Sequence, residues 1–292
     1  MFKYPPLFNG KIPTWDRDCF VIDNKKSRIL YYSNNEDGWN DELTNFHEEE
    51  TDDGNNPIDL YSRNNAVKNL IKYTNDKNLK ILEIGCSSGY LLKDLKDNFQ
   101  DAYLVGADIV SEPLQKLGRM IPDVPLVQMD ILNCPFKEEQ FDVVIALNVL
   151  EHIKDDHLAM KNIYRMLKPN GIVIIEVPAG PNLYDVYDSY LMHFRRYSKN
   201  QIYNLFKKNN LKVIYHRNIG CLVYPAFFLT KKINRYKYGI NGEKADDKKN
   251  IVKEKINSTN ENKLFELITK LEENYIDSRN LPGIRFFAVA KK

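Results

Sequence analysis

Three acidic residues stand where consecutive apolar runs end, and acids at such places can bind the hydroxyl and amine groups of a nucleoside. These residues are Glu83, Asp108 and Asp130. In a doubly wound sheet the carboxyl ends of neighbouring strands meet at one crevice. There Asp108 can accept both hydroxyl protons of a ribose. Asp130 can take the exocyclic amine of an adenine, with the apolar Ile109 and Ile131 flanking the ring.

A turn of small residues lies between the first of these runs and the next helical pattern. A strand that ends in a tight turn just before a helix N-terminus is how open α/β sheets hold a nucleotide-like ligand. The chain lacks the G-x-G-x-x-G fingerprint that lets a dinucleotide pyrophosphate approach the helix. A nucleoside ligand without phosphate does not need it, which favours S-adenosylmethionine over NAD. The turn residues predicted to bind the cofactor are Gly85, Cys86, Ser87 and Gly89.

Two histidines offer acid–base chemistry near the same crevice. His152 comes just after the fourth strand, which ends near the predicted cofactor residue Asn148, and His193 stands next to Arg195 and Arg196. An imidazole can accept the proton of an acceptor hydroxyl, and guanidinium groups can hold a phosphate or a carboxylate. Each residue also has a structural interpretation. His152 can make a hydrogen bond at a helix start, His193 can lie in a surface loop, and the arginines can form a solvated basic patch.

These side chains require a sheet whose strands end at one edge. Apolar runs of strand length occur at 79–84, 102–107, 125–129, 141–147, 171–177, 211–216 and 284–290. Segments with helical spacing fill three of the four intervals between the first five runs, at 89–99, 112–120 and 155–167. Near-continuous apolar strands that alternate with amphipathic helices predict an α/β fold. We expect a doubly wound, mostly parallel sheet covered on both faces.

Two segments fall outside this alternation. Residues 1–60 predict an N-terminal cap in which the β-prone runs 19–22 and 28–32 form a hairpin. Residues 61–218 plus 284–292 predict the cofactor-binding domain. Residues 219–283 predict a helical and loop insertion before the last strand, which shapes the acceptor site.

The insertion opens with an apolar and aromatic run at 221–229, followed by Lys231, Lys232 and Arg235. One interpretation is a core helix that closes the acceptor pocket. The other is peripheral membrane contact through residues 221–235, with the basic side chains meeting anionic lipid. Residues 236–262 are polar and rich in Asn and Lys, which favours a loop.

The composition argues against several classes of protein. The chain has 292 residues, of which 43% are hydrophobic and 28% charged, and its net charge of +2 gives no reason to expect a nucleic-acid partner. Its four cysteines are far apart, with no C-x-x-C pair, so a disulfide framework or structural zinc is not expected. The N-terminus lacks the apolar core of a signal peptide. We therefore expect a cytoplasmic location.

Taken together, these motifs resemble those of the class I S-adenosylmethionine-dependent methyltransferases. Residues 82–90 are similar to their first motif, Asp108 to their ribose acid, 129–131 to their adenine motif, 141–152 to their fourth motif and 167–177 to their fifth. The resemblance implies a seven-stranded sheet of order 3-2-1-4-5-7-6, with an antiparallel last strand near 284–290. Ser87 departs from the usual glycine but is small enough to keep the backbone close to the methionine moiety.

The segment 193–198 resembles a subgroup of this family with a Gly-His-x-Arg-Arg-Tyr run after the fifth strand, although Met192 replaces the glycine. We loosely associate this subgroup with sugar, envelope-glycan and lipid-linked substrates. The resemblance makes Arg195, Arg196 and Tyr197 candidates for binding the acceptor.

The resemblance implies in-line transfer of a sulfonium methyl group to oxygen or nitrogen of a small-molecule, sugar or lipid-linked acceptor, with S-adenosylhomocysteine as product. No metal is assigned, because the single carboxylate of Glu151 is thin evidence for one. An alternative is a protein of the same fold that binds the cofactor without transferase activity and acts as a partner or scaffold. An NAD-dependent oxidoreductase is disfavoured by the missing third glycine.

Overall fold

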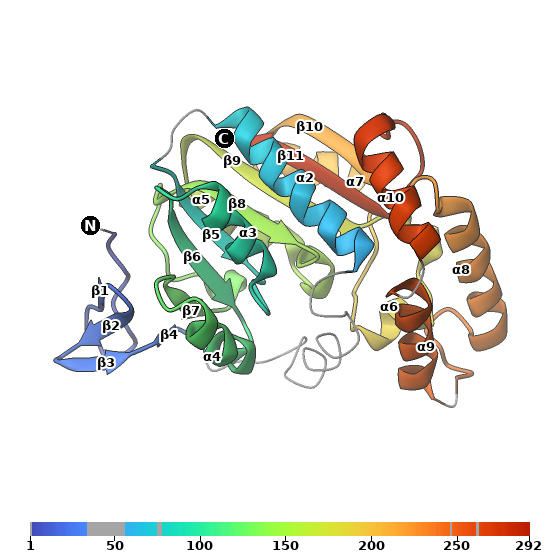
Figure 1. Cartoon of the computed structure of the whole chain (residues 1–292). Helices are drawn as coiled ribbons and strands as arrows, with labels where there is room; N and C mark the ends of the chain where they lie inside the picture. Colours follow the sequence, from blue (N-terminus) through green and yellow to red (C-terminus); the bar gives the residue numbers. More distant parts are fainter. Residues whose placement is uncertain (1, 34–55, 75–77, 246, 261–262) are drawn as a thin grey trace.

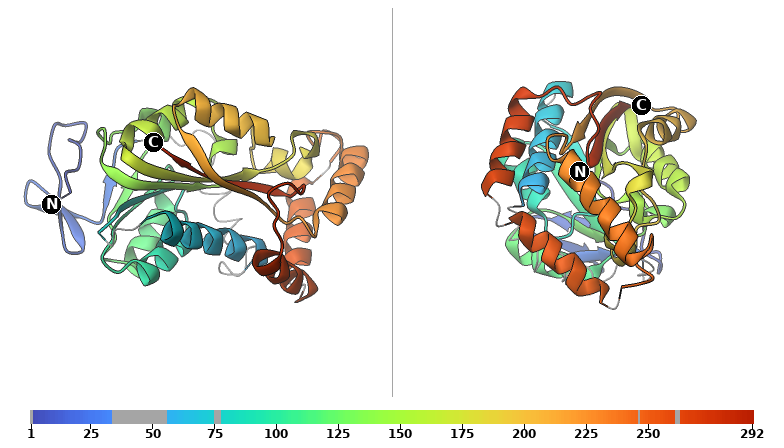
Figure 2. Two further views of the ribbon diagram at one scale, coloured as in Figure 1. Left: turned by 90° about the horizontal axis from the view of Figure 1, so that it is seen from above. Right: turned by 90° about the vertical axis from the view of Figure 1, so that its right-hand side faces the viewer.

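An eight-stranded sheet with helices on both faces forms the centre of the molecule (Figures 1 and 2). The computed structural model describes residues 2–33, 56–74, 78–245, 247–260 and 263–292. The strands lie in the order β10-β11-β9-β8-β5-β6-β7-β4, and every neighbouring pair from β9 to β4 is parallel. β11 runs antiparallel to both of its neighbours. The predicted α/β class with a mostly parallel sheet is confirmed.

Seven of the strands arise from the apolar runs described above. They are β5 (Lys80–Ile84), β6 (Tyr103–Asp108), β7 (Leu126–Gln128), β8 (Phe141–Leu147), β9 (Leu167–Pro178), β10 (Lys212–Ile219) and β11 (Arg285–Lys291). Numbered one to seven along the chain, they lie in the order 3-2-1-4-5-7-6. The central strands are apolar almost throughout because helices bury both of their faces.

The helices divide between the two faces of the sheet. α2 (Pro57–Tyr73), α3 (Tyr90–Asn98) and α4 (Ser111–Met120) cover one face, while α5 (Asp156–Met166) and α7 (Lys199–Lys208) cover the other (Figure 2). A capping box begins α7, since the Ser198 N–H donates to Gln201 Oε1 at 2.8 Å and the Gln201 N–H donates to Ser198 Oγ at 3.3 Å. The short helices η4 (Pro181–Leu183) and α6 (Val186–Tyr190) connect β9 to this point.

The N-terminal segment forms a small sheet and also supplies the eighth strand of the large one. β1 (Thr14–Asp16), β2 (Cys19–Ile22) and β3 (Lys25–Ser27) are antiparallel neighbours at one end of the molecule, whereas β4 (Ile29–Tyr31) pairs in parallel with β7 (Figure 1). The prediction that 28–32 pairs with 19–22 is therefore wrong. Asp23 and Asn24 both have positive φ, so they make a two-residue turn that pairs β2 with residues 25–27 instead.

Two boundaries of the predicted N-terminal cap also differ from the structure. β4 belongs to the main sheet, because Arg28 donates to the carbonyls of Gly118, Ile121 and Val124 at the end of α4. The limit at residue 60 falls inside α2. Residues 34–55 of the predicted cap lie outside the described residues.

Three helices fill the insertion between β10 and β11. They are α8 (Tyr224–Tyr238), α9 (Lys248–Asn260) and α10 (Lys263–Tyr275), at the end of the molecule opposite β1–β3 (Figure 1). The loop predicted for 236–262 is thus wrong over most of its length, because the lysines that, with the asparagines, favoured a loop are also good helix formers. Among the described helices, none combines the length and the apolar character that a membrane crossing needs.

Candidate active site

The turn between β5 and α3 is built so that only small residues fit it. Gly85, Ser87 and Gly89 have φ values of 73°, 39° and 74°, in the left-handed region that favours glycine. A Cβ atom on Gly89 would lie 2.2 Å from the side chain of Leu117, and one on Gly85 would lie 2.5 Å from that of Val149. The close approach of these neighbours explains the glycines at both ends of the turn.

Asp108 joins this turn to the end of β6. Its Oδ2 accepts the N–H of Ser87 at 2.8 Å, and its Oδ1 accepts the N–H of Val110 at 3.0 Å. The N–H groups of Gly85 and Cys86 donate to the backbone carbonyl just before Asp108. The buried carboxylate is therefore held at the end of β6, beside the turn that follows β5.

Asp130 lies at the neighbouring strand end, where it caps a short helix. It precedes η2 (Ile131–Asn133), and its two oxygens accept the N–H of Leu132 at 2.8 Å and the side-chain amide of Asn133 at 3.0 Å. The end of β6 lies alongside, since the Met129 N–H donates to the Asp108 carbonyl at 2.8 Å. The structure thus brings the two predicted acids to adjacent strand ends.

Glu83 and Asn148, two further residues predicted to bind the cofactor, differ in their surroundings. Burial, with the negative charge of Asp108, raises the pKa of Glu83 well above its usual value. Its Oε2 has no hydrogen-bond partner within the described part of the chain. The Asn148 side chain instead donates to Glu176 Oε1 on β9 at 3.3 Å, so it is engaged on the opposite side of β8 from the turn.

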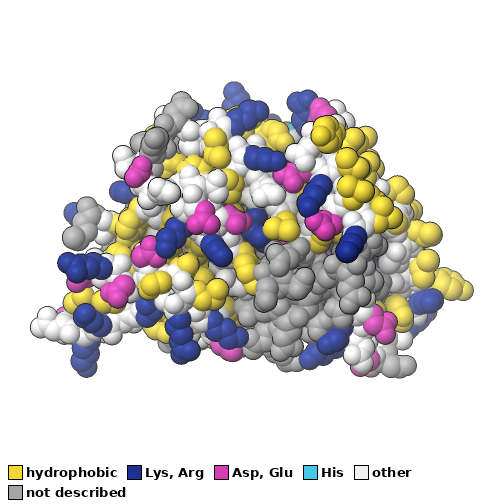
Figure 3. All heavy atoms as spheres, viewed as in Figure 1, with side chains coloured by type: hydrophobic (Ala, Val, Ile, Leu, Met, Phe, Trp, Pro, Cys, Tyr) yellow, Lys and Arg dark blue, Asp and Glu magenta, His cyan; other side chains and the backbone are white. Residues whose placement is uncertain are grey.

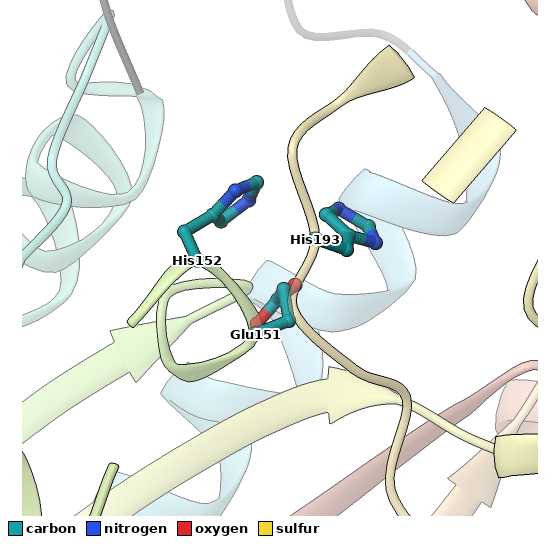
Figure 4. A group of neighbouring side chains, drawn as sticks. All are labelled: Glu151, His152 and His193. Atoms are coloured by element: carbon teal, nitrogen blue, oxygen red, sulfur yellow. The ribbon is translucent and has the colours of Figure 1, made fainter. Parts of the chain in front are cut away.

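The two predicted catalytic histidines meet beside Glu151, just past the end of β8. Glu151 and His152 belong to the short helix η3 (Leu150–His152), and His193 comes from the loop after α6 (Figure 4). The two imidazole rings are 4.6 Å apart at 80°, and one side-chain N or O atom of each of the three residues lies within 4.8 Å of the others. Burial raises the pKa of the Glu151 carboxyl to about 8.

A buried ion-pair network fixes the orientation of His193. Its Nδ1 lies 3.0 Å from Asp188 Oδ1, and Asp188 also pairs with Arg196 at 2.9 Å and with Lys231 at 2.9 Å. Burial disfavours the charged carboxylate, but Arg196 and Lys231 outweigh it and hold the pKa of Asp188 well below its usual value. Because this carboxylate accepts, Nδ1 carries the proton and Nε2 is left as the acceptor. Burial lowers the pKa of His193, which favours the neutral ring.

The basic segment predicted to contact the acceptor has a largely internal role. All three nitrogens of Arg196 donate to protein acceptors, namely the Ala179 and Ile284 carbonyls and Asp188. Tyr197 is buried, and its hydroxyl donates to the Leu150 carbonyl and to Asp156. We therefore correct the prediction for Arg196 and Tyr197, which hold the loop against the fold.

Arg195 is the more exposed of the two arginines. It pairs with Asp156 at 2.8 Å and donates to the Lys154 carbonyl at 2.7 Å. Its predicted role in binding the acceptor stays a prediction.

Comparison with known proteins agrees with this arrangement. A family model described as a methyltransferase domain matches residues 82–175. An uncharacterized protein of Methanocaldococcus jannaschii is 30% identical over 174 residues, which are 58% of this chain and 72% of that protein. The chain belongs to the class I S-adenosylmethionine-dependent methyltransferases. Its cofactor is S-adenosylmethionine, as that family membership entails.

Two further relatives of this methyltransferase show how far the likeness extends. A ubiquinone biosynthesis O-methyltransferase of Bradyrhizobium diazoefficiens is 30% identical over 129 residues, 41% of this chain and 50% of that protein. A Haemonchus contortus phosphoethanolamine N-methyltransferase, solved with S-adenosylmethionine, has a TM-score of 0.52 at 18% identity and covers 86% of this chain and 60% of its own. The methyltransferase thus spans about half the length of many curated relatives it matches.

Several residues around the site of the methyltransferase were missed by sequence reasoning. Asp185 and Asp188 were not singled out, and Lys231 was considered only for lipid contact, as one of two interpretations, although it is 4% exposed and pairs with both acids. Glu176 and Arg285, which pair at 3.0 Å, were read only as parts of strands. The one available signal was a charged residue inside an otherwise apolar strand, since such a residue needs a buried partner.

Proposed function

We propose that this methyltransferase methylates an oxygen or nitrogen atom of a small-molecule, sugar or lipid-linked acceptor held beside Glu151, His152 and His193. The observation that carries the proposal is the convergence of these side chains just past β8, the strand next to β5. Val149, the residue before η3, lies close to Gly85, so the proposed acceptor position is next to the proposed cofactor turn. The alignment of acceptor and donor in a dry site accounts for much of the rate in such reactions.

The residues at the strand ends fit the cofactor. The turn 85–89 admits no larger side chain at its glycines, which suits a close approach of ligand to backbone. Asp108 would hold the ribose hydroxyls, and Ile109, Asp130 and Ile131 would border the adenine. Glu83 would face the positively charged part of the ligand. S-adenosylmethionine, when bound, supplies a methyl group on a sulfonium centre.

His193 is suited to accept a proton from the acceptor. Asp188 binds its Nδ1, which directs the lone pair to Nε2. The lowered pKa of the ring keeps Nε2 unprotonated near neutral pH. His152, which is partly exposed, borders the same space. The pair can therefore orient a hydroxyl or amine and relieve it of its proton.

A lipid-linked acceptor is favoured by the exposure pattern of α8. Its buried residues are the polar Lys231 and Asn234, while Leu229 and Tyr236 are 60% and 88% exposed. This is the reverse of the burial pattern expected for a core helix and supports the membrane interpretation of 221–235 instead. An outward apolar face beside exposed Lys232 suits the surface of an anionic membrane. Because Lys231 also binds Asp188, a docked α8 would keep the His193 loop close to that surface.

Turnover tests the proposal. The chain is incubated with S-adenosylmethionine and a panel of phenols, amines, sugar phosphates and polyprenyl-linked sugars, and S-adenosylhomocysteine is quantified. We expect formation with at least one acceptor, lost in His193→Ala and kept in the control His216→Ala, whose ring binds Tyr203 on another part of the surface. Cofactor binding without turnover of any acceptor would favour the scaffold alternative.

A further inference from the structure

We propose that Glu151, His152 and His193 bind a divalent transition-metal ion, with zinc as the best match to the donor set. Two imidazoles and one carboxylate are the protein ligands of many catalytic zinc sites, which keep a further position open. The same set with open positions also suits iron(II). Magnesium and calcium prefer all-oxygen surroundings and fit less well.

The geometry of the three side chains is close to that of a metal site. The ligand atoms lie within 4.8 Å of one another, and they come from two separate segments, η3 and the loop after α6 (Figure 4). Zinc bonds of about 2.0–2.2 Å place ligand atoms roughly 3–4 Å apart. A small inward rotation of the side chains would therefore close the set around an ion.

Glu151 gives an independent reason to expect a cation. It is 1% exposed, and its Oε2 has no hydrogen-bond partner among the residues that the structure describes. Of the other buried carboxyls nearby, Asp188 pairs with Arg196 and Lys231, and Glu176 pairs with Arg285 through Oε1, although Glu176 Oε2 also has no hydrogen-bond partner among the described residues. A buried carboxylate is costly unless it is paired or bound to a metal.

The surroundings of His193 match those of a metal ligand. Its Nδ1 is bound to Asp188, and metal-binding histidines commonly donate their other ring nitrogen to a carboxylate, which fixes the ring. The Phe194 N–H donates to the Glu151 carbonyl at 2.7 Å, which ties the loop to η3. Because Asp188 occupies Nδ1, Nε2 is the ring nitrogen of His193 that would bind the ion.

A bound ion would narrow the class of methyl acceptor from hydroxyls and amines to hydroxyls. This consequence rests on the proposed methyl transfer. A bound divalent cation lowers the pKa of a coordinated oxygen. An acceptor hydroxyl at the open position would lose its proton to water and stay bound as an alkoxide or phenolate. In that case His193 is a ligand and the ion activates the acceptor. The site then favours hydroxyl over amine acceptors.

Zinc titration of the full chain tests the site. After dialysis against a chelator, calorimetry with zinc chloride should show one site in the wild-type chain. Glu151→Gln and His193→Ala should each weaken it by about tenfold or more, and His216→Ala should leave it unchanged. The cobalt-loaded wild type should show visible d–d bands that both site variants lose.

Binding of S-adenosylhomocysteine separates the two proposals. Loss of zinc affinity with retained S-adenosylhomocysteine affinity supports the metal site. A wild-type chain without a zinc site, or variants that bind zinc as the wild type does, would overturn it. If Glu151→Gln does not fold, His193→Ala and His152→Asn carry the test. Specific zinc binding without any methyl transfer would leave the metal site standing and refute the proposed function.

Discussion

Asp108 offers the most direct test at the scale of single residues. Its carboxylate is buried and held by two backbone N–H groups, and we propose that it also receives the ribose hydroxyls. We expect Asp108→Ala to weaken S-adenosylhomocysteine binding by about 1–3 kcal/mol, as for the loss of one partner of a buried hydrogen bond. Calorimetry measures this. Asp123→Ala is the matched control, because Asp123 pairs with Lys96 in solvent. Equal affinity in the two variants would refute the ribose assignment.

Glu83 should make cofactor binding depend on pH. Burial and the charge of Asp108 raise its pKa, so above the usual range of a glutamate the free protein still holds the neutral acid. A cationic ligand favours the carboxylate, so binding should release a proton and the affinity should rise with pH across this interval. Because the sulfonium adds a positive charge, the affinity for S-adenosylmethionine should rise more steeply with pH than the affinity for S-adenosylhomocysteine. Calorimetry in buffers of different ionisation enthalpy would detect the proton, and Glu83→Gln should abolish its release.

At this scale the sequence indicates which residue types reach the crevice but not which partners they find. Asp108 and the turn 85–89 follow from their places after β6 and β5. The internal role of Arg196 does not, because its carbonyl partners Ala179 and Ile284 lie 17 and 88 residues away. Asp188 and Lys231 are 43 residues apart, in segments without periodic patterns. Pairings of this kind are set by the fold, and a single sequence holds no local signal for them.

At the scale of elements, the buried ion pairs of Asp188 connect α6, the loop that holds His193, and α8. We expect these ion pairs to be a major source of stability. Asp188→Asn would leave Arg196 and Lys231 buried with less opposite charge, and removing one partner of a buried pair typically costs about 3–5 kcal/mol. We expect a clear fall in the urea midpoint of this variant. Lys270→Ala removes an exposed pair with Glu266 and should leave the midpoint unchanged. A small effect of Asp188→Asn would show that the network is not stabilising.

The helices and strands were predicted correctly where apolar residues recur at a regular spacing. The prediction failed where polar side chains make the buried contacts. β5 to β9 and α3 to α5 were predicted from apolar runs and helical spacing. β4 was missed as a strand of the main sheet because three residues give no periodic signal, and its place depends on Arg28 reaching α4. α8 was misread because its inner face consists of Lys231 and Asn234.

At the scale of the whole molecule, the apolar surface is concentrated on the insertion. Hydrophobic side chains gather at the end of the molecule that α8 and α10 occupy (Figure 3). The exposed members there include Leu222, Phe228, Leu229, Ile233, Tyr236, Leu264, Leu267, Leu271 and Tyr275. A concentration of exposed apolar side chains commonly marks a contact with a membrane or partner. Exposed Lys232 and Lys237 on α8 favour an anionic membrane.

Sedimentation with vesicles tests this membrane contact. We expect the chain to sediment with vesicles that contain phosphatidylglycerol, less so with phosphatidylcholine alone, and less at high salt, because screening weakens the attraction of surface lysines. A Leu229→Ser, Ile233→Ser double variant should lose binding, since both side chains are exposed on α8. The control is a Phe8→Ser, Ile12→Ser double variant, which removes even more exposed apolar side chains near the N-terminus. Equal losses of vesicle binding in the two double variants would mean that the chain adsorbs to vesicles non-specifically through exposed apolar side chains. A wild-type chain that stays in the supernatant with every vesicle would exclude membrane docking through α8 and weaken the case for a lipid-linked acceptor.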